Sequence, residues 1–248
     1  MGQDVLLVER RGGQGEVAVI TTNRPEAHNR NNFEVYEKSW KVYEELAKDP
    51  DLRVVVVTGV GKYFCTGGQV NAADPQEKER YQTAVDRYLK AKSLLKVPVI
   101  AAVNGECMAG GMNTLMGADL AVAVDTATFG YPEIKRGGFP ATAMVTAMDY
   151  MPSKLLLQYF YSGEVFGADI ALRMNLVNEV VAQEDFWPTI QKYIDMLVSK
   201  PAPLIKIGKM AYMGMKELPL QERSAYAKAV LKEVLDEQAV QQKNGGNL

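Results

Sequence analysis

The pattern of apolar and polar positions divides the first half of the chain into strands and helices. Two mainly apolar runs, 5–8 and 17–21, flank a glycine-rich turn and predict a hairpin. From Asn31 or Asn32 to Lys48, apolar residues recur at intervals of three and four, which is typical of an amphipathic helix. Runs 53–59, 97–103 and 120–124 are almost continuously apolar, which predicts parallel strands buried on both faces. The sequence therefore predicts an α/β fold.

The second half is mainly helical. Short strands are predicted at 128–130 and near 177–181, and helices at 141–149, 153–161, 167–174, 204–215 and 220–242. Prolines at 201 and 219 separate the last helices. We predict a core over 1–195 and a helical region over 196–248 that packs on a neighbouring subunit. Segment 75–96 is charged with few apolar residues, and we interpret it as a mobile helical lid rather than core.

Composition narrows the function. The 248 residues are 47% hydrophobic with a net charge of −2, which does not favour nucleic-acid binding. No apolar run approaches the roughly 18 residues of a membrane span, and the polar start lacks a signal-peptide pattern. Cys65 and Cys107 form no disulfide framework and are expected to be buried apolar fillers. The single histidine, His28, argues against most histidine-based metal sites, so we predict a cytoplasmic enzyme without a metal.

Two glycine pairs are the strongest local signals. Gly110-Gly111 follows the apolar run 97–103 and the turn Asn104-Gly105, at a predicted helix start. The first amides of a helix have no intrahelical acceptor and favour an anion. Gly67-Gly68 likewise follows a strand and a turn. Two such amides on one carbonyl oxygen would form an oxyanion hole, whereas the alternative is that the glycines only permit close helix packing.

Five motifs together resemble the crotonase family, the enoyl-CoA hydratase/isomerase superfamily. They occur in the family's order and spacing across about 5–215: Asn23-Arg24-Pro25…Asn29, Val56-Val57-Thr58-Gly59…Thr66-Gly67-Gly68, Gly105…Gly110-Gly111, Ala118-Asp119-Leu120 and Phe129-Gly130…Pro132-Glu133. The resemblance implies a spiral of ββα units with a C-terminal helical subdomain, and a homotrimer or dimer of trimers. It also implies an acyl-CoA thioester as substrate and no further cofactor.

The resemblance assigns roles to individual residues. The oxyanion donors fall on the amides of Gly68 and Gly110, and the acid/base residue on Glu133. Asn113 stands where hydratases of the family carry a second glutamate, and an amide cannot exchange a proton at neutral pH. Substrate and CoA contacts fall on Arg24, Ala27, His28, Thr66, Gly67, Gln69, Val70, Gly111, Tyr131, Pro132 and Lys209. Lys206 is an alternative to Lys209 for the CoA phosphates.

With one glutamate, isomerisation or hydration of an enoyl-CoA is the leading hypothesis. Decarboxylation or β-keto/C–C hydrolysis in the same oxyanion hole is an alternative, and Glu106, Tyr131 and Gln69 are candidates for tuning the reaction. A catalytically silent family member acting as a scaffold or RNA-binding subunit is a third reading. A Rossmann site would need Gly-x-Gly-x-x-Gly after the first strand, which this sequence lacks.

Overall fold

The main sheet carries the core of the protein. A computed structural model describes residues 4–71 and 73–243. The sheet has the strand order β1-β2-β3-β5-β7-β10. Its strands are β1 (Leu6–Arg11), β2 (Val17–Thr22), β3 (Val54–Gly59), β5 (Val99–Val103), β7 (Leu120–Val124) and β10 (Glu179–Val181). Only the β1–β2 hairpin is antiparallel, and every residue of β3 and β5 is buried. The predicted hairpin and buried parallel strands are confirmed.

A second sheet of short strands stands beside the first. It contains β4 (Tyr63–Cys65), β6 (Glu106–Met108), β8 (Thr128–Gly130) and β9 (Val165–Gly167), in the order β4-β6-β8-β9. Each of β3, β5 and β7 is followed by one of these short strands and then by a helix, which is the predicted ββα repeat. Because β4, β6 and β8 are parallel, the turns that follow them leave the same edge of this sheet.

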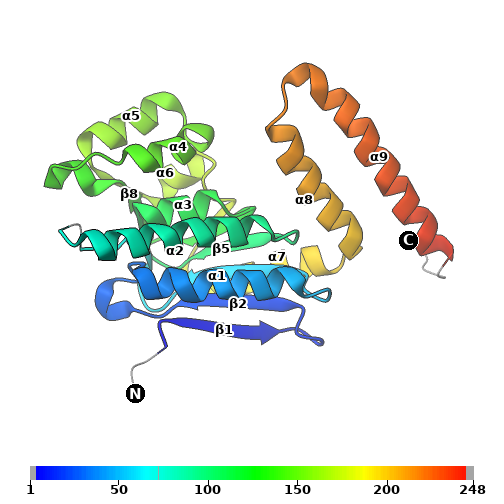
Figure 1. Cartoon of the computed structure of the whole chain (residues 1–248), viewed down its shortest axis with the longest axis horizontal. Coiled ribbons are helices and arrows are strands. Elements are labelled where there is room, and N and C mark those ends of the chain that lie inside the picture. Colours follow the sequence, from blue (N-terminus) through cyan, green and yellow to red (C-terminus); the bar gives the residue numbers. More distant parts are fainter. Residues whose placement is uncertain (1–3, 72, 244–248) are drawn as a thin grey trace.

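Helices α1 (Phe33–Lys48) and α2 (Pro75–Ser93) pack on each other over the main sheet (Figure 1). Their first turns are capped, because the side chains of Asn32 and Asp74 accept backbone hydrogen bonds. The prediction that α2 lies outside the core is wrong. Ala84 and Ala91 are buried, and the ring of Tyr88 lies 5.5 Å from that of Tyr43. Alanine and tyrosine at helical spacing form the contact face, although the segment has few strongly apolar residues.

Within the part of the chain that the structure describes, five further helices and three 3₁₀ turns complete the core. The helices are α3 (Gly110–Met116), α4 (Ala141–Tyr150), α5 (Ser153–Ser162), α6 (Ala168–Arg173) and α7 (Phe186–Val198). The 3₁₀ turns are η1 (Pro25–Ala27), η2 (Pro132–Arg136) and η3 (Gln183–Asp185). The turn η1 lies between β2 and α1, and η2 directly follows β8 of the second sheet.

The C-terminal helices α8 (Ala202–Lys216) and α9 (Leu220–Lys243) form a hairpin that stands away from the sheets (Figure 1). Lys209 ties α8 to the core, because its Nζ donates to Asp119 Oδ2 and to the Val97 carbonyl, each at 2.8 Å. Among the described residues, no helix is both long and apolar enough to cross a membrane. The boundary at 195/196 and the contact with a neighbouring subunit stay predictions, and 1–3, 72 and 244–248 fall outside the described residues.

Candidate functional site

Two glycine turns meet at the edge of the second sheet. A Cβ built on Gly110 would lie 3.5 Å from Gly67 Cα and 3.7 Å from the Gly68 nitrogen. Asn31 brackets Gly68, because its amide donates to the Gly67 carbonyl and its carbonyl accepts from the Gln69 amide, both at 2.9 Å. In such a parallel bridge the amide of the middle residue points to the other side. The Gly68 amide is thus turned away from Asn31.

The amide of Gly110 is presented by a strained residue. Ala109 has φ 51° and ψ −116°, a conformation that L-residues rarely adopt. Two main-chain bonds hold it there: Ala109 donates to the Gly130 carbonyl at 2.9 Å and accepts from the Met112 amide at 3.0 Å. Gly110 is the first residue of α3, so its amide has no intrahelical acceptor.

The second glycine of that pair serves packing. A Cβ on Gly111 would lie 2.0 Å from the Cys65 carbonyl oxygen, so only glycine allows α3 to approach β4 this closely. The packing alternative considered for the pair therefore describes Gly111, which was predicted to bind substrate. Gly110 has only ordinary van der Waals distances around its missing side chain.

A cavity of about 760 Å³ opens in front of the two turns. It is lined by six predicted site residues: His28, Thr66, Gly67, Gly68, Pro132 and Glu133. The strained Ala109 lines it as well, whereas Gly110 adjoins it through Gly67 and Gly68. Glu106 and Met108, which are alternate residues of β6, face it together, while the intervening Cys107 is fully buried on the opposite face. The structure therefore brings the glycine turns and Glu133 to one cavity.

Glu133 is a half-buried carboxyl in that wall. It lies in η2, and the Gly138 amide closes the turn on its carbonyl at 3.1 Å. Burial raises the pKa of Glu133, and the nearby Arg136 opposes this shift only partly. Its Oε2 is buried and has no hydrogen-bond partner in the described part of the chain. A raised pKa in a cavity is typical of a group that takes up and releases protons near neutral pH.

Unpaired buried polar atoms gather around the same turns. Within the described residues, the buried side-chain oxygens without a partner belong to Asn31, Gln69, Asn113, Tyr131 and Glu133. Four of these were predicted as site residues. Of these residues only Glu133 lines the 760 Å³ cavity, and the structure does not place Gln69, Asn113 or Tyr131 in its wall.

The family follows from comparison with known proteins. A model of the enoyl-CoA hydratase/isomerase family matches residues 12–246. The chain belongs to this family. Short-chain-enoyl-CoA hydratase of Clostridium acetobutylicum is 31% identical over 205 residues, which are 80% of this chain and 78% of that protein. Carnitinyl-CoA dehydratase of Escherichia coli K12 is 31% identical over 222 residues, 87% of this chain and 84% of that protein.

The fold agrees with a solved structure of this family. The crystal structure of an enoyl-CoA hydratase from Mycobacterium smegmatis matches with a TM-score of 0.86 and 29% identity, covering 93% of this chain and 90% of that chain. The crotonase resemblance and the predicted fold class are therefore confirmed. The protein is a member of an enzyme family whose named relatives are hydratases and dehydratases of acyl-CoA compounds.

The other predicted contacts lie around or outside the cavity. Arg24 donates to the Arg30 carbonyl and stiffens the loop that contains Ala27, while Gln69 and Val70 follow the Gly67-Gly68 turn. Tyr131 is fully buried, with its ring 4.3 Å from that of Phe160. Lys209 lines a different groove, and the structure does not bring it together with the glycine turns. These contacts stay predictions.

Arg30, Arg136 and Val165 line the cavity but were not predicted. Neither arginine belongs to a sequence motif. Arg136 follows Glu133 by three residues, however, and a tight turn would place the two side chains on the same side of the turn. Val165 belongs to β9, which pairs antiparallel with β8. No apolar run in the sequence predicts this strand.

Both cysteines belong to the hydrophobic core. Both are free and buried, and burial raises the pKa of Cys65 to about 11 and that of Cys107 well above its usual value. The expectation that they fill space is confirmed. Among the described residues, no cluster of three histidine, cysteine or acidic side chains is arranged to hold a metal ion.

The raised pKa of Glu133 predicts a pH-dependent stability. Its folded-state pKa exceeds the unfolded value of about 4.5, so the folded protein binds more protons between the two, and stability falls as pH rises through this window. Glu133→Gln is expected to raise the melting temperature slightly at pH 7.5 and to leave it unchanged at pH 4. Thermal unfolding at both pH values tests this, and an equal shift at both would contradict it.

Proposed function

We propose that the protein moves a proton at Cα of an enoyl-CoA thioester and stabilises the resulting enolate. The unpaired Oε2 of Glu133, in the same cavity as the Gly67-Gly68 turn, carries this proposal. Glu133 removes a proton from Cα, and the electron pair shifts onto the thioester oxygen. The amides of Gly68 and Gly110 hold this oxygen, and each such donor is typically worth about 3–4 kcal/mol of transition-state stabilisation.

In a 3-enoyl substrate the same glutamate completes an isomerisation. The electron pair returns from the oxygen, the double bond forms between Cα and Cβ, and Glu133 delivers its proton to Cγ. One carboxyl is enough for these reaction steps.

Asn113 lies three residues after Gly110 on α3, on the same side of the helix, and its buried Oδ1 is unpaired. In this scheme the Asn113 amide orients the acyl chain and exchanges no proton.

Hydration is the second candidate, and Glu106 favours it. This residue places a second carboxyl in the cavity, although it comes from β6 and not from the α3 position that Asn113 occupies. Glu133 takes a proton from water as the water oxygen adds to Cβ and the pair of the double bond shifts to the thioester oxygen. The pair then returns to Cα, which takes that proton from Glu133. Glu106 or Asn113 would hold the water. The names of the relatives, a hydratase and a dehydratase, agree with this direction.

The cavity wall also offers cations for a thioester with phosphate groups. Arg30, Arg136 and His28 line it, and the His28 ring stacks on Tyr63 with ring centroids 4.3 Å apart. We propose that this rim holds the CoA part, with Arg24 supporting the loop, and that no other cofactor takes part. A homotrimer or dimer of trimers remains our proposal for the assembly, with Lys209 as a phosphate contact there.

Two thioesters distinguish the reactions. The protein is incubated in D₂O with a 3-enoyl-CoA and, separately, with a 2-enoyl-CoA, and absorbance and deuterium at Cα are followed. Isomerisation predicts conversion of the 3-enoyl compound, whereas hydration predicts loss of the 2-enoyl absorbance. Turnover of only a β-keto or malonyl-type thioester would favour the hydrolase or decarboxylase alternative. Failure to bind CoA in a titration would favour a silent family member.

Restoring a carboxyl at position 113 is expected to favour water addition. Asn113→Glu should raise the hydration rate of a 2-enoyl-CoA at least about tenfold, because a second general acid/base then reaches the water. Asn113→Gln has the same length without an acid and is the control. The ratio of hydration to isomerisation is measured for both variants, and an equal ratio in the two would contradict the proposed role of position 113.

A further inference from the structure

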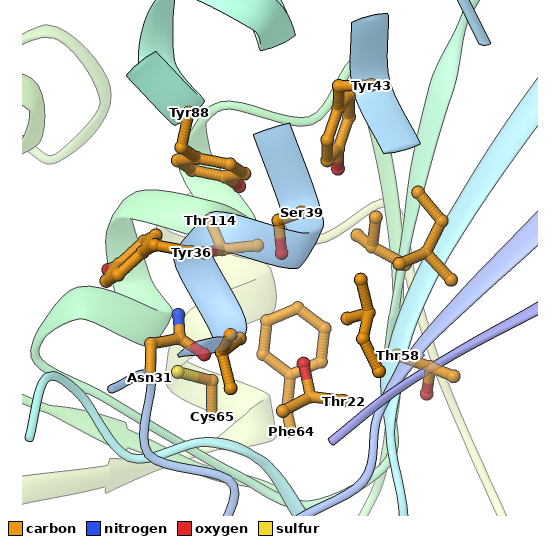
Figure 2. A pocket seen from close by; sticks show the side chains of 14 residues that line it. Thr22, Asn31, Tyr36, Ser39, Tyr43, Thr58, Phe64, Cys65, Tyr88 and Thr114 are labelled. Atoms are coloured by element: carbon orange, nitrogen blue, oxygen red, sulfur yellow. The ribbon is translucent and has the colours of Figure 1, made fainter. Parts of the chain in front are cut away.

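A small cavity lies between the main sheet and helices α1 and α2. Its volume is about 40 Å³, and residues of the main sheet, α1, α2, β4 and α3 line it. Phe64 and Cys65 of β4 form one wall, and Thr114 of α3 reaches it from another side (Figure 2). It is separate from the 760 Å³ cavity, because the residues that line the two differ.

The lining of this cavity is rich in oxygen atoms. Figure 2 shows the side-chain oxygens of Thr22, Asn31 and Ser39 turned toward its interior, with the Tyr43 hydroxyl above them. Asn31 is 9% exposed, and its Oδ1 is buried without a partner among the described residues. Leaving a buried carbonyl oxygen without a hydrogen bond is unfavourable, because the oxygen has lost its water. A volume of about 40 Å³ exceeds the roughly 10–15 Å³ that one water requires.

The same residues support both oxyanion turns. The main chain of Asn31 holds Gly67 and Gln69 through two bonds of 2.9 Å and so fixes the direction of the Gly68 amide. On the other side, Thr114 Oγ1 donates to the Gly110 carbonyl at 3.4 Å. A shift of Asn31 or Thr114 would therefore move one of the two amides relative to the other.

Tyr36 of α1 and Tyr88 of α2 also line this cavity. Burial raises the pKa of Tyr36 well above its usual value, and the Asn31 side chain next to it acts in the opposite direction. Burial likewise raises the pKa of Tyr88, and the Thr114 hydroxyl opposes the shift. Each tyrosine therefore keeps its proton and stays neutral beside one of the two supporting residues.

We propose that the small cavity is a water-binding site and that its water, bonded to Asn31 Oδ1, positions the Gly68 amide for catalysis. Ordered water in a polar cavity forms about three hydrogen bonds, and the unpaired Asn31 Oδ1 is joined in the lining by the hydroxyl-bearing Thr22 and Ser39. Asn31 is thus a positioning residue that acts through Gly67 and Gln69. The water site itself rests on the cavity alone, whereas its catalytic consequence rests on the proposed function.

A crystal structure at about 1.5 Å or better tests the water site without any activity. We expect density for water within hydrogen-bond distance of Asn31 Oδ1. An empty cavity overturns the proposal, whatever the protein catalyses.

Two substitutions at one position test the catalytic consequence. Ser39→Val fills the cavity and expels the water, while Ser39→Ala removes only one of its partners. Ser39→Val is expected to lower kcat about tenfold with KM within twofold of wild type, and Ser39→Ala is expected to stay within twofold in both. Asn178→Leu, which removes a distant bond to the Ala121 amide, controls for lost stability alone. Equal kcat values for the two Ser39 variants, with water present in the crystal, overturn the positioning role but leave the proposed function intact.

Discussion

Glu133→Gln is expected to lower the rate of deuterium incorporation at Cα of an enoyl-CoA by about 10³-fold, because general acid–base groups contribute about 10²–10⁴. The amide has nearly the same shape as the carboxyl, so the cavity should still bind the thioester. KM is therefore expected to change much less than kcat. The measurement is exchange at Cα, followed by mass spectrometry, since it reports proton transfer even where no net reaction occurs.

A nearby acidic residue provides the control for this prediction. Glu164 pairs with Lys135 at 2.7 Å and is exposed, so Glu164→Gln removes the same charge outside the cavity. It should leave exchange within about twofold of wild type. If Glu106 rather than Asn113 holds the water, Glu106→Gln is expected to slow hydration and to leave exchange largely intact, because Glu106 then contacts the water and not Cα. If Glu133→Gln keeps the wild-type exchange rate, the single-base proposal is wrong.

Gly111→Ala is expected to destabilise the fold by at least about 3 kcal/mol, the upper end of typical overpacking effects. The added methyl would lie 2.0 Å from the Cys65 carbonyl oxygen, and backbone cannot rotate away as a side chain can. This clash can be removed only if α3 moves away from β4. Urea unfolding measures the free energy of unfolding, and a loss below about 1 kcal/mol would contradict the packing role.

Gly110→Ala, at the adjacent position, is expected to lower kcat and to leave the free energy of unfolding nearly unchanged. Its new methyl would meet Gly67 and Gly68 at 3.5–3.7 Å, which are ordinary contacts, so stability should change little. However, the methyl would stand next to the Gly68 amide, where the proposed enolate oxygen binds, so kcat is expected to fall. A stable but inactive Gly110 variant beside an unstable Gly111 variant would separate ligand approach from packing within one glycine pair.

The sequence was sufficient for much of the fold because burial leaves a direct pattern. Almost continuously apolar runs at 53–59 and 97–103 predict strands of the main sheet, and strands β3 and β5 within them are buried as expected. The second sheet was harder, since β6 and β9 have only three residues each and no period to recognise. Helix α2 was misread because its contacts use alanine and tyrosine, which hydropathy counts as weakly apolar.

The site was predictable in part for similar reasons. Glycine pairs after strands, together with the family motifs, indicated the two turns and Glu133, which the structure brings to one cavity. No sequence pattern distinguishes Gly110 from Gly111, because their roles depend on which neighbour stands opposite each missing side chain. Arg30 and Val165 could not be predicted, since their place in the cavity follows from how distant segments pair.

The two proposed oxyanion donors are main-chain amides, held by main-chain bonds to Asn31 and Gly130. No point substitution deletes such a donor, except replacement by proline. The chemistry that depends on the enolate can therefore persist while the side chains that face the substrate are exchanged. A programme of redesign on this scaffold can leave the glycine turns untouched and alter the outcome of the reaction through positions 106, 113 and 133 alone.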